Sequence, residues 1–191
     1  SGATPFTPDK AAPADPYGLS KWEAEQALAE VAATRGLGVT ILRPPLVHGP
    51  GVKGNLRRLL QAIDRGLPFP LGAIDNRRAL IGVENLVAAI RRAVERPAAA
   101  GQVRTYTLRD AETVSTPELI HRLAAARGRS ARLWPVPVSW LRLAGRLTGR
   151  SETIRRLTET LEIDDRLIRT ELAWSPPQSL DQGLLAMARG G

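Results

Sequence analysis

The chain has 191 residues, of which 43% are hydrophobic, so it is long enough and apolar enough for one domain with a packed core. It contains no cysteine, which excludes disulfides, thiol catalysis and cysteine-based metal sites. The net charge of +8 comes almost wholly from arginines spread along the chain, and aromatic residues make up only 4%. We therefore expect a solvated basic surface and no nucleic-acid partner.

The sequence also argues against metal-binding and membrane-spanning classes. His48 and His121 are the only histidines and lie far apart in the sequence, so we predict no metal site. No apolar run approaches the ~18 residues of a membrane-spanning helix, and the first residues do not resemble a secretory signal. We accordingly expect no membrane partner and a cytoplasmic location.

The first predicted element is a helix over residues 16–35, which follows a proline-rich loop over residues 1–15. Tyr17 and Lys21 lie four residues apart at its start and therefore share a helix face. A free phenol has a pKa near ~10, and a cation one turn away lowers that pKa, so the pair can move a proton on or off a hydroxyl. The same spacing also occurs by chance on amphipathic helices, and only the flanking sequence favours catalysis.

A short apolar and β-branched run, residues 39–42, predicts a buried strand that stops at Arg43-Pro44-Pro45. The glycines within residues 49–54 have the spacing of a dinucleotide fingerprint. We reject an NAD pyrophosphate site here, because two prolines and further residues separate the strand from the first glycine. A glycine-rich loop before a helix predicted from Asn55 to Arg65 can still offer free N–H groups to a phosphate. An ordinary flexible loop is the alternative.

The remaining elements are predicted from periodicity, caps and chain breakers. They are a stiff apolar loop or edge over 68–72, an apolar helix over 83–95, an alternating strand over 103–108, a helix capped by Ser115 and reaching about Arg127, a short strand over 131–134, a helix capped by Asp164 and ending near Trp174, and a last helix with a capping box at Ser179–Gln182.

Residues 139–147 predict an amphipathic helix. Its apolar side carries Trp140, Leu141, Ala144 and Leu147, and another side carries Arg142 and Arg146, with Arg150 beyond the helix. Such a helix can lie on a membrane surface or bind an acidic partner. We favour an ordinary surface helix.

Taken in order, these motifs resemble the C-terminal half of the extended short-chain dehydrogenases/reductases, the NAD-dependent nucleotide-sugar epimerase/dehydratase family, and its UDP-glucose 4-epimerase-like members most of all. The resemblance extends from about Pro5 to Met187. It rests on Tyr17-Gly18-Leu19-Ser20-Lys21 at a helix start, Leu42-Arg43-Pro44-Pro45-Leu46-Val47-His48-Gly49-Pro50-Gly51 after it, Arg78 before an apolar helix, and Asp164 through Leu172-Ala173-Trp174-Ser175-Pro176-Pro177 near the end.

The resemblance implies a role for each matching residue. Tyr17 would be the acid/base that acts on a sugar hydroxyl, and Lys21 would lower its pKa and hold the nicotinamide ribose of NAD or NADP. Pro44 and Pro45 would lie against the nicotinamide. The implied substrate contacts are Asn55 at the diphosphate, Phe69 and Leu71 beside the base, and Arg78 with Arg155 or Arg156 as a phosphate clamp.

Two positions depart from the family pattern. Leu46 stands where epimerases of this kind often have asparagine, which leaves the identity of the sugar open. His48 stands where tyrosine is common, and we interpret it as a structural loop residue.

The implied fold is α/β, the C-terminal part of an extended short-chain dehydrogenase/reductase. Residues 1–52 would be the remnant of a Rossmann domain, with the Tyr-x-x-x-Lys helix and the following strand. Residues 53–191 would form the nucleotide-sugar substrate-binding region, with a strand near 103–108 returning to the Rossmann sheet. The glycine-rich NAD turn of the family's N-terminal half does not occur in the sequence, so we expect a fragment that binds NAD weakly and is inactive alone.

Three functions follow from these observations. The first is the nucleotide-sugar portion of an NAD-dependent epimerase/dehydratase, with a UDP-hexose type of substrate. The second is a non-catalytic nucleotide-sugar-binding fragment, and the third, ranked last, is a basic protein for nucleic acid or acidic surfaces. Strands without their sheet partners leave open edges, so we expect a homodimer or strand-exchanged oligomer. The resemblance implies that the Tyr17 helix is a contact, since the family usually dimerises through it.

Overall fold

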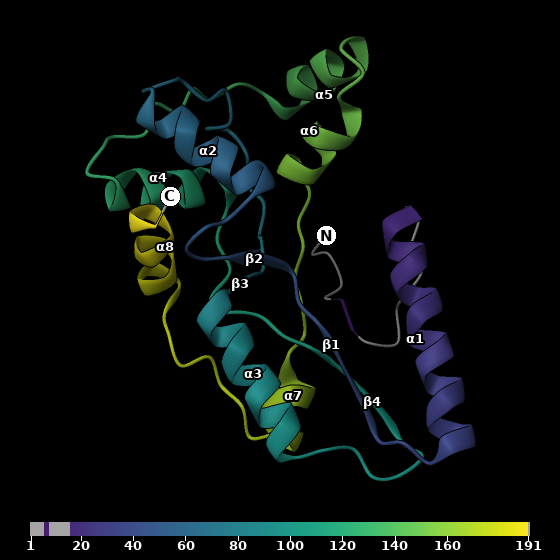
Figure 1. Ribbon diagram of the computed structural model, residues 1–191. Helices are drawn as coiled ribbons and strands as arrows, with labels where there is room; N and C mark the ends of the chain where they lie inside the picture. Colours follow the sequence, from purple (N-terminus) through teal and green to yellow (C-terminus); the bar gives the residue numbers. More distant parts are fainter. Residues whose placement is uncertain (1–5, 8–15, 191) are drawn as a thin grey trace.

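The chain is an α/β structure in which helices surround short parallel strands, as the fold class predicted (Figure 1). The computed structural model describes residues 6–7 and 16–190, so most of the predicted loop over residues 1–15 lies outside the described residues. The elements are α1 (Pro16–Arg35), β1 (Val39–Arg43), β2 (Leu46–His48), α2 (Gly54–Asp64), β3 (Leu80–Gly82), α3 (Val83–Glu95), β4 (Val103–Thr107), α4 (Thr116–Ala126), α5 (Val138–Leu147), α6 (Ser151–Thr158), α7 (Arg166–Glu171) and α8 (Leu180–Arg189). None of the helices among the described residues has the length and apolar character needed to cross a membrane.

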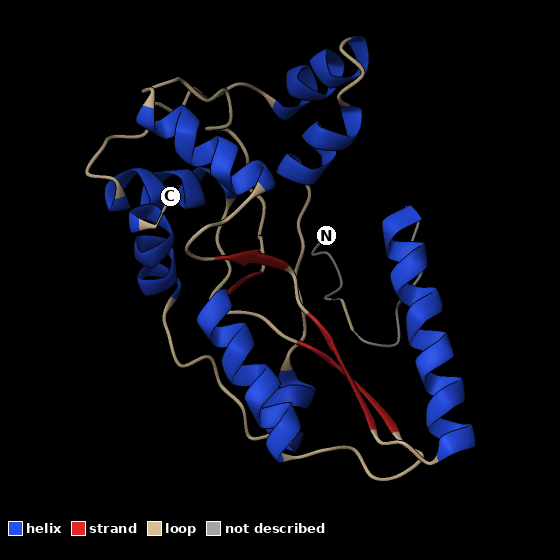
Figure 2. Cartoon of the chain, in the orientation of Figure 1, coloured by secondary structure: helices blue, strands red, loops and turns tan. Residues whose placement is uncertain are grey.

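Pro44 and Pro45 divide one extended segment into two strands. Before the prolines, β1 pairs in parallel with β4, from Val39 opposite Val103 to Arg43 opposite Thr107. After them, β2 pairs in parallel with β3. Proline has no N–H to donate to a strand ladder, so the first pairing stops and the segment continues beside a new partner (Figure 2).

Two hydrophobic clusters fill the interior. The first lies among α2, α4, α5, α8 and β3 and includes Leu56, Leu123 and Met187. The second lies among β3, β4, α3 and α7 and includes Tyr106 and Trp174. Neither cluster, within the described part of the chain, contains a residue of α1. The predicted domain boundary at residue 52 stays a prediction.

Helix α1 lies beside the β1–β4 pair, away from the other helices (Figure 1). Among its residues only Ala32 is buried, whereas Leu19, Trp22, Leu28 and Val31 are exposed. Most helices in proteins are stabilised by packing of one face, and α1 has little such packing on this chain. The apolar side that the sequence predicted for this helix is therefore largely open.

The β1–β4 pair is open as well. Every residue of β1 is only half-buried, and a groove of about 420 Å³ lies between β1 and α3. Val87, Ile90 and Val94, which the periodicity assigned to the apolar side of α3, are exposed, while the small Ala89 and Ala93 are buried. Parallel sheets are normally covered on both faces, so this exposed apolar surface agrees with the expectation for a partial sheet.

The predicted helix caps are present. The Ser115 hydroxyl accepts a hydrogen bond from the Glu118 N–H at the start of α4. The capping box at Ser179 and Gln182 forms in both directions at the start of α8. Asp164 accepts the Arg166 N–H at 3.1 Å, although the residue directly before α7 is Asp165.

Two local predictions are wrong. Residues 131–134 do not form a strand, because their only ladder contact among the described residues is a single bridge of Leu133 with Phe69. His48 is not a loop residue but the last residue of β2, and it is 1% exposed.

Candidate functional site

Tyr17 and Lys21 lie one turn apart at the amino end of α1, as their spacing predicted. The Lys21 ammonium lies 5.6 Å from the centre of the Tyr17 ring. The Tyr17 side chain is 73% exposed, so its hydroxyl is open to a ligand. Helix α1 runs opposite to β1, which places its amino end at the end of the molecule where β1 and β4 terminate (Figure 1). In open α/β sheets, ligands bind outside these carboxyl ends.

An ion pair fastens this helix to the sheet. Glu25, one turn beyond Lys21, receives a two-pronged contact from Arg43, in which Arg43 Nε donates to Glu25 Oε1 at 3.0 Å and the second prong reaches Oε2. Planar guanidinium–carboxylate pairs of this kind fix orientation as well as distance. Because Arg43 is the last residue of β1, the pair fastens the side of α1 that carries Tyr17 and Lys21 to the carboxyl end of this strand.

The amino end of α2 follows the glycine-rich loop, where the sequence predicted contact with a phosphate. The residue before the helix, Lys53, makes no side-chain capping hydrogen bond, and Asn55 on the first turn is exposed. The first N–H groups of a helix have no partner within the helix, and they attract anions. Gly51 and Gly54 have φ angles of 71° and 66°, a conformation that residues with a Cβ rarely adopt.

Arg78 lies beside α6, so the structure brings together two parts of the predicted phosphate clamp. The Arg78 backbone bridges to Val114 on one side and Leu161 on the other. Its guanidinium donates to the carbonyl oxygen of Arg156, at the end of α6. Burial of this side chain lowers the pKa of Arg78 from its usual value. A partly desolvated guanidinium gains from an added anion, which suits contact with a phosphate.

Arg155 and Arg156 already have carboxylate partners. Arg155 pairs with Glu152 and Glu159, and Arg156 pairs with Glu152, all on the exposed surface of α6. The hydrogen bonds from Arg155 and then Arg156 lower the pKa of Glu152 to about 2. A phosphate could recruit either arginine only in competition with these exposed pairs, which are individually weak.

Phe69 and Leu71 lie on the first hydrophobic cluster. Leu71 is 8% exposed and belongs to the cluster itself, and the half-buried Phe69 packs against it. The Phe69 N–H donates to Arg132 O at 2.8 Å, and its carbonyl accepts from the Trp134 N–H at 2.9 Å. Of the two, Phe69 retains more open surface for a flat ligand, and the roles of both residues stay predictions.

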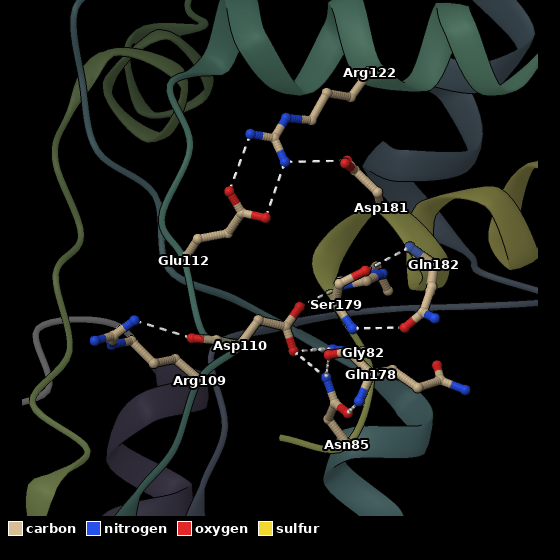
Figure 3. A network of polar contacts seen from close by, with 11 residues as sticks. Gly82, Asn85, Arg109, Asp110, Glu112, Arg122, Gln178, Ser179, Asp181 and Gln182 are labelled. Carbon is tan, nitrogen blue, oxygen red and sulfur yellow. Dashed lines mark hydrogen bonds and ion pairs between the residues drawn. The ribbon is translucent and has the colours of Figure 1, made fainter. Parts of the chain in front are cut away.

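A buried polar network at the junction of β2, β3 and α3 was missed by the sequence analysis (Figure 3). Asp110 Oδ1 accepts from the Gly82 N–H at 2.9 Å and from Asn85 Nδ2 at 2.7 Å, and Oδ2 lies 2.7 Å from His48 Nε2. Nδ1 of His48 has no hydrogen-bond partner among the described residues. The ring proton therefore belongs on Nε2, where it is donated to the carboxylate. Asn85 in turn exchanges two hydrogen bonds with the Gln178 backbone.

Nothing local to His48 or Asp110 signals this network, because the two residues are 62 positions apart in the chain. Asn85 gives no signal either, because it lies on the side of α3 opposite Val87 and Val94, which periodicity assigns to the apolar side. Only its burial in the structure shows that its amide needs hydrogen-bond partners.

A groove of about 710 Å³ lies elsewhere, between β4 and α7, and none of the predicted site residues lines it. Tyr106 donates to Glu171 Oε2 across it at 2.6 Å. Burial first, and then the hydrogen bond with Glu171, raises the pKa of Tyr106. The charged side chains that line this groove are paired with one another, as Arg166 is with Asp164.

The chain resembles proteins that act on nucleotide sugars and related compounds. The NAD dependent epimerase/dehydratase family matches residues 2–108. A UDP-glucose 4-epimerase of Vibrio cholerae is 41% identical over 187 residues, which are 97% of this chain and 56% of the relative. The N-acetyl-alpha-D-glucosaminyl-diphospho-ditrans,octacis-undecaprenol 4-epimerase of Escherichia coli O157:H7 is 26% identical over 96% of this chain and 60% of its own length.

Solved structures with a similar fold include an epimerase bound to its substrate and cofactor. A UDP-glucuronic acid 4-epimerase from Bacillus cereus, solved with UDP-glucuronic acid and NAD, superposes with a TM-score of 0.73 at 21% identity, covering 99% of this chain and 56% of that one. The chain thus spans somewhat more than half the length of the curated relatives it matches. With the family match extending over more than half of its residues, the chain belongs to the NAD dependent epimerase/dehydratase family.

Proposed function

We propose that this chain is the substrate-binding portion of an NAD-dependent nucleotide-sugar epimerase/dehydratase that acts on a UDP-hexose. The observation that carries the proposal is the exposed Tyr17–Lys21 pair on a helix that the Glu25–Arg43 ion pair fastens to the carboxyl end of β1. The 41% identity with a UDP-glucose 4-epimerase supports this choice of substrate class.

Tyr17 takes a proton from a sugar hydroxyl and later returns one. Lys21 supports this role as the neighbouring cation, with its ammonium 5.6 Å from the centre of the Tyr17 ring. NAD or NADP would supply the hydride acceptor and donor for the same sugar carbon. The residues present fit the nicotinamide end of such a dinucleotide, because the exposed phenol and ammonium stand on a helix fastened to the carboxyl end of β1, where the two prolines follow. Lys21 would hold the ribose, and Pro44 and Pro45 would flank the ring.

The substrate diphosphate binds, in this proposal, between α2 and the Arg78 segment. Asn55 and the first amides of α2 meet one phosphate, and Arg78 meets the other with help from Arg155 or Arg156. Phe69 and Leu71 flank the base. Arginine suits this task because its planar fork pairs with phosphate oxygens two at a time.

The domain division proposed from the sequence fits these roles. Residues 1–52 carry the catalytic pair and the strand of the Rossmann portion, and residues 53–191 hold the substrate, with β4 returning to pair with β1. Taken alone, the 191 residues should bind the sugar nucleotide without turning it over, since they contain no glycine-rich NAD turn.

A chimera tests the catalytic role. We would replace the matching residues of the Vibrio cholerae enzyme with this chain and measure conversion of UDP-glucose to its 4-epimer. Tyr17→Phe should abolish turnover while UDP-glucose binding, followed by calorimetry, stays within a few-fold. Tyr106→Phe, which alters a buried tyrosine away from the proposed site, is the matched control for loss of a phenol. Equal turnover by the chimera and its Tyr17→Phe variant would remove Tyr17 from the mechanism.

Binding of UDP-glucose and NAD distinguishes the non-catalytic alternative from the enzyme proposal. A fragment that serves only as a nucleotide-sugar module should bind UDP-glucose with Arg78 contributing and should bind NAD weakly. Arg78→Gln is expected to weaken UDP-glucose binding about 10-fold or more, in line with loss of a charge-assisted contact. Arg92→Gln, on α3, is the control. Tight NAD binding by the 191 residues would contradict the module alternative.

A second substrate class is a hexose carried on a polyprenyl diphosphate. The Escherichia coli relative acts on such a lipid-linked sugar, and a nucleotide sugar and a lipid-linked sugar share the diphosphate that Arg78 and α2 are proposed to bind. The exposed tryptophan and leucines of α5, with arginines beside them, favour this class. Competition between UDP-glucose and a short-chain polyprenyl diphosphate sugar in the chimera distinguishes the two.

Self-association is also proposed. The exposed apolar residues of α1, together with the open edge of β1, predict a homodimer or strand-exchanged oligomer. Light scattering measures this directly, and a monomer at high protein concentration would argue against it.

A further inference from the structure

Helix α5 has two apolar faces, and only one of them packs on the protein. Leu141 belongs to the first hydrophobic cluster, and Gly145 is buried against Ile154 of α6. Trp140 is 70% exposed, Leu143 57% and Leu147 80%. These three residues follow the i, i+3, i+7 spacing of a single helix stripe, on the side opposite Leu141. Figure 1 shows α5 and α6 projecting together at the edge of the molecule, with no other element over α5.

The segment before the helix adds a further exposed aromatic residue. Trp134, a few residues upstream, is 59% exposed. A large exposed aromatic and leucine patch on a soluble domain is uncommon and marks a surface that binds something. We call Trp134, Trp140, Leu143 and Leu147 the α5 patch.

Positive charge flanks the α5 patch on its own helix, and the carboxylates of the neighbouring α6 segment, Glu152 and Glu159, are already paired with arginines. Residues 119–151 contain seven arginines and no aspartate or glutamate. Arg142 and Arg146 lie on the helix face between the α5 patch and the buried side, and Arg150 follows the helix. None of these three takes part in an ion pair between described residues, whereas Arg155 and Arg156 on the next helix do. The three cations are therefore available to an external anionic surface.

We propose that the α5 patch and its flanking arginines form a docking surface for an anionic phospholipid bilayer. Tryptophan and leucine enter the headgroup boundary, and the arginines beside them contact lipid phosphates, in the manner of amphipathic helices that lie in the membrane interface. This departs from the ordinary surface helix that the sequence alone favoured. The inference goes beyond the nucleotide-sugar proposal and does not depend on it, because it concerns a surface and not the Tyr17 site.

A bilayer fits this surface better than a second protein copy does. A contact between two copies would bring the same arginines together across a two-fold axis without any carboxylate of residues 119–151 to neutralise them. A bilayer of anionic lipids supplies both the apolar phase for the stripe and the negative charge for its flank. Tryptophan is also enriched at the membrane–water boundary, because its ring is apolar and its N–H is polar.

Vesicle sedimentation tests the proposal with the 191-residue chain. The chain should sediment with vesicles of phosphatidylglycerol and phosphatidylcholine in equal parts, much less with pure phosphatidylcholine, and less as salt is added. The double variant Arg142→Gln/Arg146→Gln should lower partitioning roughly 30-fold, since each arginine near an anionic surface contributes about a factor of five. Trp140→Ser/Leu147→Ser should reduce it at least as much at high salt, where the apolar contribution dominates.

Matched controls come from α3. Val87→Ser/Val94→Ser removes exposed apolar residues elsewhere, and Arg91→Gln/Arg92→Gln changes the net charge by the same amount. Both should partition as the parent chain does. All variants change exposed residues, so urea unfolding should confirm that they remain folded.

A second readout locates the contact. Brominated phosphatidylglycerol should quench tryptophan fluorescence in the parent chain and less in Trp140→Phe, which keeps an aromatic residue and hence most of the binding. No sedimentation with anionic vesicles would overturn the proposal, and so would equal losses in the α5 and α3 variants. If Trp140→Ser/Leu147→Ser instead converts a dimer to a monomer in light scattering without altering vesicle binding, the α5 patch is a contact between copies and the lipid proposal fails.

Discussion

Replacing Asp110 by asparagine should be among the most damaging single changes in the described part of the chain. The carboxylate is fully buried and accepts three hydrogen bonds, from His48, Gly82 and Asn85. Asparagine has almost the same shape, but one of its two terminal atoms is an NH₂ donor. If that donor faces the Gly82 N–H and the Asn85 amide, donors meet donors. If it faces His48, Nε2 can accept it only when the ring proton moves to the buried Nδ1, which has no acceptor among the described residues.

The expected cost follows from these contacts. A hydrogen bond to a charged group contributes about 1.5–3 kcal/mol, and a buried donor left without an acceptor costs about a further 1–3 kcal/mol. We therefore expect Asp110→Asn to lower the free energy of unfolding by about 3–5 kcal/mol. Domains are stable by only about 5–15 kcal/mol, so the loss is a large share of the total. With a urea m-value of about 2 kcal/mol per molar, the midpoint should fall by about 2 M.

Urea unfolding of the parent chain and variants, followed by circular dichroism, measures this loss. Glu95→Gln is the matched carboxylate-to-amide control, because Glu95 pairs with Arg91 and Arg92 on the exposed surface of α3. It should leave the urea midpoint nearly unchanged. His48→Gln and the double variant complete a cycle that isolates the His48–Asp110 coupling. A loss below about 1 kcal/mol for Asp110→Asn would refute the reasoning, since it would mean that the network carries no charge-assisted contacts.

Three further outcomes are expected. Glu25→Gln should loosen the amino-terminal turns of α1 from Arg43, so amide hydrogen exchange should become faster in these turns and change little elsewhere. An unchanged exchange rate in these turns, or an equal increase over the whole chain, would contradict the fastening role. Gly183→Ala should destabilise the chain by about 1–3 kcal/mol in thermal unfolding, because an added Cβ would lie 2.5 Å from His48 Cε1. The pKa of Glu152 is lowered from 4.5 to about 2 on folding, so its pairing stabilises α6 fully above pH 4.5 and is lost as pH falls toward 2; a carboxyl titration by NMR with a midpoint near 4.5 would contradict the pairing.

The sequence predicted those elements whose signals are local. The helix over 16–35 and the strands at 39–42 and 103–108 were placed to within a residue or two, because glycines, prolines and β-branched runs mark their ends. The capping residues Ser115 and Ser179 were found for the same reason, since a cap acts within three residues of itself. The Tyr17–Lys21 pair was likewise a matter of spacing along one helix.

Features that depend on distant residues were missed. His48 was placed in a loop, because no residue near it in the sequence indicates its contact with Asp110, 62 positions away. The buried side of α3 was misassigned, since periodicity selected the large Val87 and Val94, whereas the close approach of the neighbouring strands selects the small Ala89. Periodicity gives the faces of a helix but does not say which face the rest of the fold covers.

The difference between local and distant contacts also applies to charge. The net charge can be counted from the sequence, whereas the positions of the unpaired charges depend on the fold. Arginines such as Arg43 and Arg122 hold the fold together through carboxylates on other elements. Cations that make no ion pair with a described residue lie instead on and just after α5, at Arg142, Arg146 and Arg150, and directly before α2, at Lys53. Both surfaces belong to the lobe built on the first hydrophobic cluster. An anionic diphosphate and an anionic bilayer would therefore be drawn to the same lobe, so a sugar carried on a lipid diphosphate could meet Arg78 while its lipid remains in the membrane beside α5.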